Sequence, residues 1–436
     1  MVYMRIRVRN SKSKKIISLF LFVTTFYPTL GFTSYNSNNS LLTIILIKAV
    51  NHTNHSVKDA LITIPISSII KKYPDFNEKA FTVFDRKKEI PSQTEDINGD
   101  EKADNVLIVV DFIRGEEKKI SLQYDKLAVI KKEFKKRTHA ELSVKTDYIL
   151  ENGFYTKGKF NSVKNSTVPV NHFAHNALYK YEGPGWESEK VAYRFYLDSR
   201  NRNDIFGKKV DDLVLNVVGI NDLVSDSKES YTKMCDWGMD IFKVGESLGI
   251  GSIAIWDNTQ VNTISNTETT TCKITNDGII KSNVLTTYKN TKVGKSQFDI
   301  SSLISISAGS RLTREDLTIS DPSQLICTGI AKHAECSLIL DKENYEWGYI
   351  ATYGKQSLAY DNLGLAIFYK KSNLVKNTED ILNYISVLKP VDGNLTYYFG
   401  SAWENEKNGI HNKIEFIEYL DKTISELSHP ISIELL

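Results

Sequence analysis

Hydrophobic and polar residues alternate along much of this chain, and the alternation predicts β-strands. Between residues 191 and 198, apolar side chains at every second position alternate with Ala192, Arg194, Tyr196 and Asp198, which is the two-residue period of a strand. The pattern predicts one apolar face for burial and one face that carries Arg194, Tyr196, Asp198 and, if the strand continues, Arg200. Such a face fits a polar binding groove or a solvated sheet surface with cross-strand ion pairs. The density of aromatic and charged residues over 181–207 favours the groove.

The same pattern recurs on both sides of this stretch. Four or five short strands between residues 41 and 124 predict a small β-sandwich, and Pro65 ends one of them or places it at a sheet edge. From His139 to the end of the chain the pattern stays mostly β. Residues 231–248 predict a helical or irregular insertion. Residues 415–427 predict a terminal amphipathic helix. The fold class is therefore mostly β.

The N-terminus has the layout of a secretory signal. Six basic residues precede an apolar run at 16–26, and no acidic residue occurs before Asp59. The apolar run is short for a membrane span of about 20 residues, although an uncleaved anchor is the alternative. We therefore expect a signal peptide at 1–33, no membrane span after its removal, and a periplasmic or secreted protein. A small N-terminal β domain at 34–135 and a larger β domain at 136–436 would follow.

Composition narrows the function classes. A formal net charge of +2 argues against a surface dedicated to nucleic acid. The four cysteines show no C-x-x-C spacing and do not predict a zinc site. Cys327 and Cys336 fit a hairpin disulfide in an oxidising compartment, and four independent thiols fit equally well.

One acidic loop has partial calcium-loop spacing. Asp96, Asn98, Asp100 and Asp104 place oxygens at relative positions one, three, five and nine, and Gly99 allows a sharp turn. Leu107 stands where a bidentate glutamate is expected. The alternatives are a calcium site and a hairpin loop that needs these residues for its backbone angles alone.

Candidate catalytic residues concentrate in and just before residues 181–207. His172 and His175 form an H-x-x-H pair that could ligate a metal or act as an acid or base, and His333 is a further candidate. Arg194, Tyr196, Asp198 and Arg200 complete the catalytic set. The candidate substrate-binding residues are aromatic or charged: Glu182, Trp186, Glu187, Trp237, Lys243, Trp256 and Asp257. The sequence lacks G-x-S-x-G, H-E-x-x-H and P-loop motifs.

Several long motifs resemble one family. These are YEGPGWESEKVAYRFYLDSRNRNDIFGKK, DWGMDIFKVGESLGIGSIAIWD, AGSRLTREDL, WGYIATYGKQSLAYDNLGLAIFYK and YYFGSAWE, and the DINGDEKADNVLIVVDF loop is similar as well. Over residues 40–425 they resemble the secreted bacterial family labelled domain of unknown function 4861. The resemblance implies a β-supersandwich of the galactose-mutarotase type behind the small N-terminal domain. It also implies a role beside polysaccharide-degrading, pectin-type systems, without assigning catalytic residues.

These observations predict an exported carbohydrate-active protein whose substrate is an acidic, uronate-containing glycan. In a lyase, Arg194 or Arg200 would neutralise the uronate carboxylate, and a histidine or Tyr196 would move the proton. In a hydrolase, two carboxylates drawn from Glu182, Glu187, Asp198 and Asp257 would serve as acid and base. The alternative is a non-catalytic glycan-binding module that uses tryptophans as stacking platforms.

Overall fold

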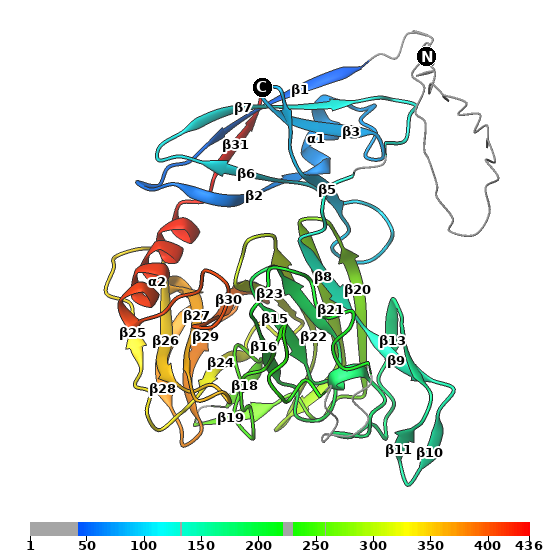
Figure 1. The fold of residues 1–436 in the computed structure, drawn as a ribbon, viewed down its shortest axis with the longest axis vertical. Coiled ribbons are helices and arrows are strands. Elements are labelled where there is room, and N and C mark those ends of the chain that lie inside the picture. The colour runs from blue at the N-terminus through cyan, green and yellow to red at the C-terminus, as the bar shows by residue number, and fades with distance from the viewer. Residues whose placement is uncertain (1–41, 131–132, 221–229, 258) are drawn as a thin grey trace, which may run out of the picture. The chain divides into compact units, whose positions relative to one another are not determined.

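The computed structural model describes residues 42–130, 133–220, 230–257 and 259–436, and Leu41–Leu436 form one compact unit (Figure 1). These residues are mostly β, in antiparallel sheets, which confirms the predicted fold class. The galactose-mutarotase type stays a prediction, and the predicted signal at 1–33 lies outside the described residues. Within the described ranges, no helix is both long and apolar enough to cross a membrane.

Two sheets enclose the core of the N-terminal part. The first has the order β31-β1-β7-β3-β4, and the second has the order β2-β6-β5. Alternate residues such as Ile45, Ile47, Ile62 and Ile108 bury their side chains in one shared cluster, as the period of two requires. The strands are β1 (Thr43–Val50), β2 (Val57–Pro65), β3 (Phe81–Asp85), β4 (Lys88–Glu89), β5 (Ser92–Glu95), β6 (Asn105–Phe112), β7 (Glu117–Tyr124) and β31 (Ser432–Leu435).

One strand end in this part follows the local sequence pattern, and one strand pairing does not. Pro65 ends β2 and is the N-cap of the short helix α1 (Ile66–Lys72), because proline lacks the donor that would continue the ladder. The last strand, β31, returns to pair with β1, with Ile47 opposite Leu435. This long-range pairing has no signal in the sequence. The predicted boundary at 135/136 stays a prediction.

A nine-stranded antiparallel sheet forms the centre of the larger part, in the order β13-β20-β21-β22-β23-β30-β27-β26-β25. Its strands are β13 (Asn165–Thr167), β20 (Thr269–Asp277), β21 (Lys281–Val293), β22 (Ser296–Ser307), β23 (Leu312–Ile319), β30 (Asn394–Trp403), β27 (Asn362–Lys370), β26 (Trp347–Lys355) and β25 (Ile339–Leu340).

Two five-stranded sheets share a core with it. One, in the order β17-β16-β15-β14-β8, comprises β17 (Gly238–Asp240), β16 (Asn203–Lys208), β15 (Ala192–Phe195), β14 (Gly185–Ser188) and β8 (Thr138–Glu141). The other, in the order β19-β18-β24-β29-β28, comprises β19 (Gln260–Thr263), β18 (Ala254–Asp257), β24 (Leu325–Ala331), β29 (Asn383–Leu388) and β28 (Leu374–Glu379). Two small hairpins pair β10 (Ile149–Glu151) with β11 (Phe154–Thr156) and β9 (Ser143–Thr146) with β12 (Lys159–Ser162).

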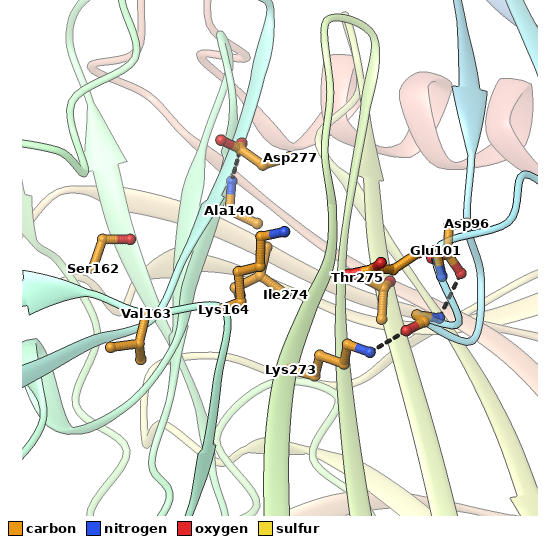
Figure 2. A pocket seen from close by; sticks show the side chains of 11 residues that line it. Asp96, Glu101, Ala140, Ser162, Val163, Lys164, Lys273, Ile274, Thr275 and Asp277 are labelled. Atoms are coloured by element: carbon orange, nitrogen blue, oxygen red, sulfur yellow. Dashed lines mark hydrogen bonds between the residues drawn. The ribbon is translucent and has the colours of Figure 1, made fainter. Parts of the chain in front are cut away.

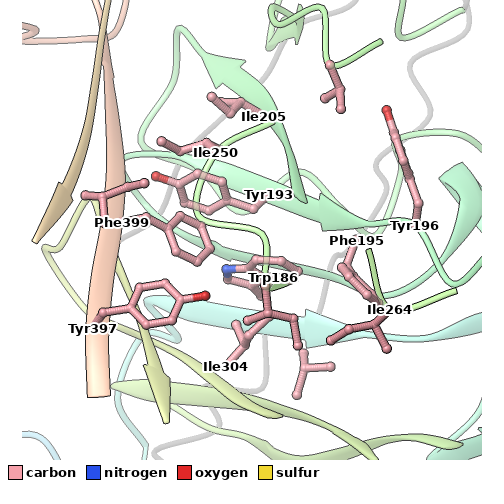
Figure 3. Packing of buried hydrophobic residues seen from close by; sticks show 14 of the residues in the cluster. Trp186, Tyr193, Phe195, Tyr196, Ile205, Ile250, Ile264, Ile304, Tyr397 and Phe399 are labelled. Carbon is pink, nitrogen blue, oxygen red and sulfur yellow. The ribbon is translucent and has the colours of Figure 1, made fainter. Parts of the chain in front are cut away.

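Aromatic side chains fill the space between these sheets, as Figure 3 shows. The rings of Trp186 and Tyr193 stack with centroids 5.8 Å apart. The indole Nε1 of Trp186 donates to Thr313 Oγ1 at 2.8 Å, and the hydroxyl of Tyr193 donates to the carbonyl oxygen of Arg311 at 2.8 Å. Their polar atoms are thus satisfied inside the core. The stretch 185–206 therefore anchors one five-stranded sheet to the nine-stranded one.

The terminal helix α2 (Lys413–Ser428) contains the predicted helix at 415–427. The side chain of its N-cap, Asn412, accepts hydrogen bonds from the backbone of Ile414 and Glu415, which satisfies donors that the helix leaves open. Phe416, Leu420 and Ile424 bury the apolar stripe. The predicted insertion at 231–248 is irregular apart from β17. The two 3-10 turns are η1 (Lys180–Glu182) and η2 (Lys371–Asn373). Cys327 and Cys336 are buried free thiols and do not form a hairpin disulfide.

Candidate functional site

The turn before β14 places Glu182 at the end of the β14–β15 hairpin. Tyr181 and Glu182 both have left-handed backbone angles, with φ of 39° and 77°, a conformation that non-glycine residues rarely adopt. A Cβ on Gly183 would clash with the carbonyl oxygen of Phe195, so only glycine fits this close approach. The backbone amide of Leu197 donates to the carbonyl oxygen of Glu182 at 3.1 Å. The strained turn therefore holds Glu182 beside the chain that follows β15.

His175, Glu182, Asp198 and Arg200 form the outer layer of a charged cluster. Arg200 donates from Nε to Asp198 Oδ1 at 2.8 Å and from Nη2 to Asp198 Oδ2 at 2.6 Å. The same Nη2 donates to Glu182 Oε1 at 2.5 Å. That oxygen also lies 2.8 Å from His175 Nδ1. Although burial opposes it, Arg200 lowers the pKa of Asp198, so this carboxylate stays ionised near neutral pH.

The outer layer is partly accessible to solvent. The side chain of His175 is 73% exposed, that of Arg200 is 22% exposed and that of Glu182 is 14% exposed, whereas that of Asp198 is buried. The nitrogen Nη1 of Arg200 has no hydrogen-bond partner among the described residues, and it is not a buried atom. The outer layer thus presents an imidazole, a carboxylate and a guanidinium nitrogen that can still donate a hydrogen bond.

Arg194, Tyr196, Asp204 and Asp240 form the inner layer behind it. Arg194 Nη2 donates to Asp204 Oδ2 and to Asp240 Oδ2, each at 2.6 Å. The hydroxyl of Tyr196 donates to the same oxygen of Asp204. Burial, together with the neighbouring charge of Asp204, raises the pKa of Asp240 to about 8, although Arg194 opposes the shift. The layer is sealed from solvent, because all four residues are buried.

The two layers meet at Glu182 and at the ring of Tyr196. Arg194 Nη1 lies 3.9 Å from Glu182 Oε2. The guanidinium of Arg200 lies 4.0 Å from the ring centroid of Tyr196, and that of Arg194 lies 5.1 Å from the same centroid. The ring of Tyr196 therefore contacts both guanidinium groups, an arrangement that cation–π attraction favours.

His172 lies next to this cluster but is turned inward. Its ring meets that of Tyr179 edge-on, with centroids 5.1 Å apart. Both ring nitrogens are buried and have no hydrogen-bond partner among the described residues. Burial lowers the pKa of His172, although the charge of Asp198 opposes the shift. The imidazole is therefore neutral near pH 7.

The structure thus brings six of the seven candidate catalytic residues together: His172, His175, Arg194, Tyr196, Asp198 and Arg200. Glu182, a candidate for substrate binding, lies in their centre. His333 is exposed, and no hydrogen bond or ion pair among the described residues joins its side chain to the cluster. Lys243 and Asp257 are likewise exposed and unconnected to it.

Two candidate substrate-binding residues are in the interior instead. Trp186 is fully buried in the core, so its faces are not available to a ligand. Glu187 is also fully buried, where it pairs with Lys208 at 2.8 Å and accepts hydrogen bonds from the backbone of Val214 and Leu215. Substrate contact by these two stays a prediction, and their burial stands against it, because the β14 side chains on both faces of the sheet are covered.

The other two tryptophans are half-buried and have neighbours on their rings. Trp237 meets the ring of Phe206 edge-on, with centroids 6.0 Å apart. Lys376 Nζ lies 4.7 Å from the ring centroid of Trp256. Neither belongs to the outer layer, so the three tryptophans do not line one shared groove.

Two acidic residues of the inner layer were missed by sequence reasoning. Asp204 lies directly opposite Arg194 in the β15–β16 pairing, so a hairpin register drawn around residues 195–203 would have found this opposite-charge pair. Asp240 comes from β17, which pairs with the far side of β16. No spacing in the sequence indicates that contact.

The acidic loop at 96–104 engages its own backbone. The carboxylate of Asp96 accepts from the amides of Gly99 and Glu101, Asn98 accepts from Asp100, and Asp104 accepts from Ile97. Lys273 donates to the carbonyl oxygen of Gly99, and Figure 2 shows its side chain pointing at the loop. Among the described residues no group of three or more acidic, His or Cys side chains is placed to hold a metal ion. The structure therefore gives the calcium prediction no support.

Two cavities lie away from the charged cluster. One, of about 340 Å³, is lined by this loop and by Lys164, Lys273 and Asp277 (Figure 2). The other, of about 490 Å³, includes Arg311, Arg314 and Tyr419 in its lining. Neither contains a residue of the inner or outer layer. We place the candidate site at the charged cluster because it joins accessible acid–base groups to a cation.

Comparison with known proteins identifies a family. The model for a family described as "Domain of unknown function (DUF4861)" matches residues 50–433. No curated protein matches the chain. Among solved structures, an alpha-mannosidase from Enterococcus faecalis V583 is similar at a TM-score of 0.41 and 9% identity, over 90% of this chain and 46% of that one. A protein in the glycosyl hydrolase family 38 from Enterococcus faecalis gives 0.40 and 9%, over 90% and 47%. The chain spans less than half of these proteins, and at such scores the likeness supports no functional conclusion.

Proposed function

This chain belongs to the DUF4861 family, and we propose that it is an exported carbohydrate-active enzyme that cleaves uronate-containing, pectin-type glycans by β-elimination. The observation that carries the proposal is the accessible, unpartnered Nη1 of Arg200 beside the His175–Glu182 pair. The basic and apolar N-terminal sequence supports export. Recovery of a shortened protein from the periplasm or the medium would test that part.

Arg200 is the group suited to a uronate carboxylate. Its Nε and Nη2 are committed to Asp198 and Glu182, and Nη1 remains as a donor towards solvent. Pairing with a guanidinium withdraws charge from the substrate carboxylate and makes the neighbouring C5–H more acidic. Because Asp198 stays ionised behind it, the guanidinium keeps its orientation while the substrate enters.

His175 is the group suited to move the proton. Its ring is exposed, and Glu182 Oε1 at 2.8 Å fixes the orientation of Nδ1 and stabilises the imidazolium that forms. In the proposed step His175 takes the proton from C5 and the electrons of that bond form a C4–C5 double bond. The C4–O bond breaks, and the leaving oxygen receives a proton from the imidazolium or from water. The products are an unsaturated uronate end and a new reducing end.

The hydrolase alternative fits the geometry less well. It needs two carboxylates that face the scissile bond, roughly 5 to 9.5 Å apart. Glu182 is partly accessible, but Asp198 is buried against Arg200, and Asp204 and Asp240 are sealed behind Arg194. The binding-module alternative loses Trp186 as a stacking platform, since that ring is in the core.

The test is incubation of the mature protein with pectic and other uronate-containing polysaccharides, with ultraviolet absorbance and reducing ends followed together. A parallel rise in both is the expected result. Reducing ends alone would indicate hydrolysis, and neither signal with retention on a glycan affinity gel would indicate a binding module. Loss of the His175 imidazole is expected to lower kcat by at least about 100-fold.

A matched histidine makes this test specific. His411 is also exposed and lies in the segment before α2, so His411→Ala should keep the wild-type rate while His175→Ala loses it. An unchanged rate in His175→Ala together with a loss in His333→Ala would overturn the assignment of the base.

A further inference from the structure

Two exposed aromatic rings lie next to the charged cluster, one on the β10–β11 hairpin and one in the loop that follows His172. Phe154 and Phe173 are 45% and 39% exposed, and their rings meet edge-on with centroids 5.2 Å apart. Phe154 lies on β11, opposite Glu151 of β10. Phe173 lies in the loop between His172 and His175. We define these two rings as the aromatic platform.

The platform is built into the loop that presents His175. Asn152 and Gly153 have φ of 52° and 86°, the left-handed pair of a tight hairpin turn. A Cβ on Gly153 would lie 3.0 Å from the ring of Phe173, so the ring of Phe173 packs against this turn. The amide of Tyr155 donates to the carbonyl oxygen of Asn176 at 2.9 Å. The hairpin and the segment that carries His175 are thus tied together.

The two rings contact each other at the surface, beside the segment that carries His175, and are open to a ligand there. The core lies close to this hairpin, because Tyr155, the next residue of the same strand, is buried. Phe154 and Phe173 instead keep their rings at the surface. Aromatic faces bind the C–H faces of sugar rings by apolar contact, and polar groups around them hold the hydroxyls.

We propose that the aromatic platform binds sugar residues of the glycan chain beside the cleavage site, so that the protein prefers long chains to short oligosaccharides. This inference rests on the proposed function for the identity of the ligand, an acidic polysaccharide. The platform would contact the apolar C–H faces of sugar rings in the glycan, and Arg200 would bind the carboxylate of a uronate residue.

A protein partner fits the platform less well. A fully buried aromatic side chain removes about 150–250 Å² from water, and these two rings are less than half exposed. The surface that they offer is therefore far below the roughly 800 Å² per partner of a stable interface. Polar residues flank it, among them Glu151, Asn152 and Thr156. A sugar or two would cover it.

Tyr148 provides a matched control on the same hairpin. It is 45% exposed, as Phe154 is, but its ring packs on Tyr155, with centroids 4.7 Å apart. Leu150 pairs with Tyr155, and both side chains point to the face opposite that of Phe154, because successive residues of a strand alternate. Tyr148 precedes Leu150 by two residues and belongs to the same face as Leu150. Its removal deletes an exposed aromatic ring without touching the platform.

The experiment compares wild type, Phe154→Ala, Phe173→Ala and Tyr148→Ala on affinity gels that contain pectic polysaccharide, and in rate assays with the polymer and with a trimer. The two platform variants should weaken retention roughly tenfold and raise KM for the polymer by a similar factor, with a smaller effect on the trimer. Tyr148→Ala should behave as wild type. Phe154→Trp should restore binding, which separates a stacking role from a loss of folding.

Failure of the two proposals is distinguishable. Loss of retention in the platform variants of a protein that shows no cleavage would leave the platform standing and overturn the lyase. Cleavage with equal retention and equal KM in all four proteins would overturn the platform. Absence of retention in wild type would overturn it as well. A change from dimer to monomer in Phe154→Ala, by light scattering, would assign the rings to self-association instead.

Discussion

Arg194 and Arg200 lie six residues apart, each is bound to two carboxylates, and both contact the ring of Tyr196. Their surroundings differ. Arg194 is buried, and its guanidinium is hydrogen-bonded to Asp204, Asp240 and the hydroxyl of Tyr231. Arg200 follows the end of the strand and keeps Nη1 open.

The difference shows how one ion-pair motif can serve two purposes. Burial of charges costs several kcal/mol per ion unless each is paired, so the inner layer must be complete in itself. The outer layer is partly exposed, so its desolvation costs less free energy, and Nη1 of Arg200 can remain without a protein partner. The inner layer therefore fixes the position of β15, and the outer layer provides the groups that can meet a ligand.

The largest effect should come from Arg194→Met. Removal of one partner of a buried pair costs about 3–5 kcal/mol, here because the carboxylate of Asp204 would be left buried without its guanidinium partner. We expect the free energy of unfolding, from denaturant titration, to fall by that amount. Arg200→Met should cost less than Arg194→Met, because the side chain of Arg200 is 22% exposed and water can replace part of its contacts. It should still cost more than the loss of an exposed pair, because Asp198 is buried, and it should abolish cleavage.

Equal losses of stability in the two variants would refute the division into two layers. The double variant Arg194→Met with Asp204→Asn sharpens the test. Because it removes the uncompensated charge, it should be more stable than Arg194→Met alone.

The pH dependence of the free energy of unfolding should have opposite signs for the inner layer and the outer layer. The pKa of Asp240 is raised from its ordinary value of 3.8 to about 8. Between these values the folded protein holds a proton that the unfolded chain has lost, so this group makes stability fall as the pH rises, by up to about 1.4 kcal/mol per pH unit. The pKa of Asp198 is lowered, so its contribution is present above its ordinary pKa and is lost as the pH falls.

Asp240→Asn should therefore have a flatter decline in unfolding free energy than wild type between about pH 5 and about pH 8. Glu315 is an internal reference, because burial raises its pKa to about 8 as well and it remains in the variant. Some decline should thus persist. Parallel curves for wild type and Asp240→Asn would show that Asp240 is not the proton-holding group.

Much of the fold could be predicted because it follows from local alternation. The alternation at 191–198 contains the strand β15, which spans Ala192–Phe195, and the apolar stripe at 415–427 lies within α2. The pairing of β31 with β1 joins the two ends of the described chain. Such a contact depends on the completed fold, so no local pattern contains it.

The sequence indicated most of the residues that belong to the charged cluster but not how deeply each of them is buried. The residues of one strand face were expected either to line a groove or to be solvated, and the structure buries Arg194 and Tyr196 instead. The reason is that the segment at 210–218 and Tyr231 cover the outer side of β15 and β16 with a second apolar cluster. That cover comes from parts of the chain that carry no periodic signal.

The smallest effect concerns the other acidic cluster, the loop at 96–104. Its oxygens are engaged by the loop's own amides, in contrast to the carboxylates that Arg194 and Arg200 hold. Asp96→Ala removes the acceptor for two amides and should lower the free energy of unfolding by about 1 kcal/mol. Asp100→Ala removes the acceptor for one exposed amide, that of Lys102, and should cost less. Calcium at about 1 mM, which saturates most protein sites, should leave the melting temperature of wild type unchanged. A rise in melting temperature that Asp96→Ala abolishes would instead establish the loop as a calcium site, and it would show that its amides release the carboxylates when the ion binds.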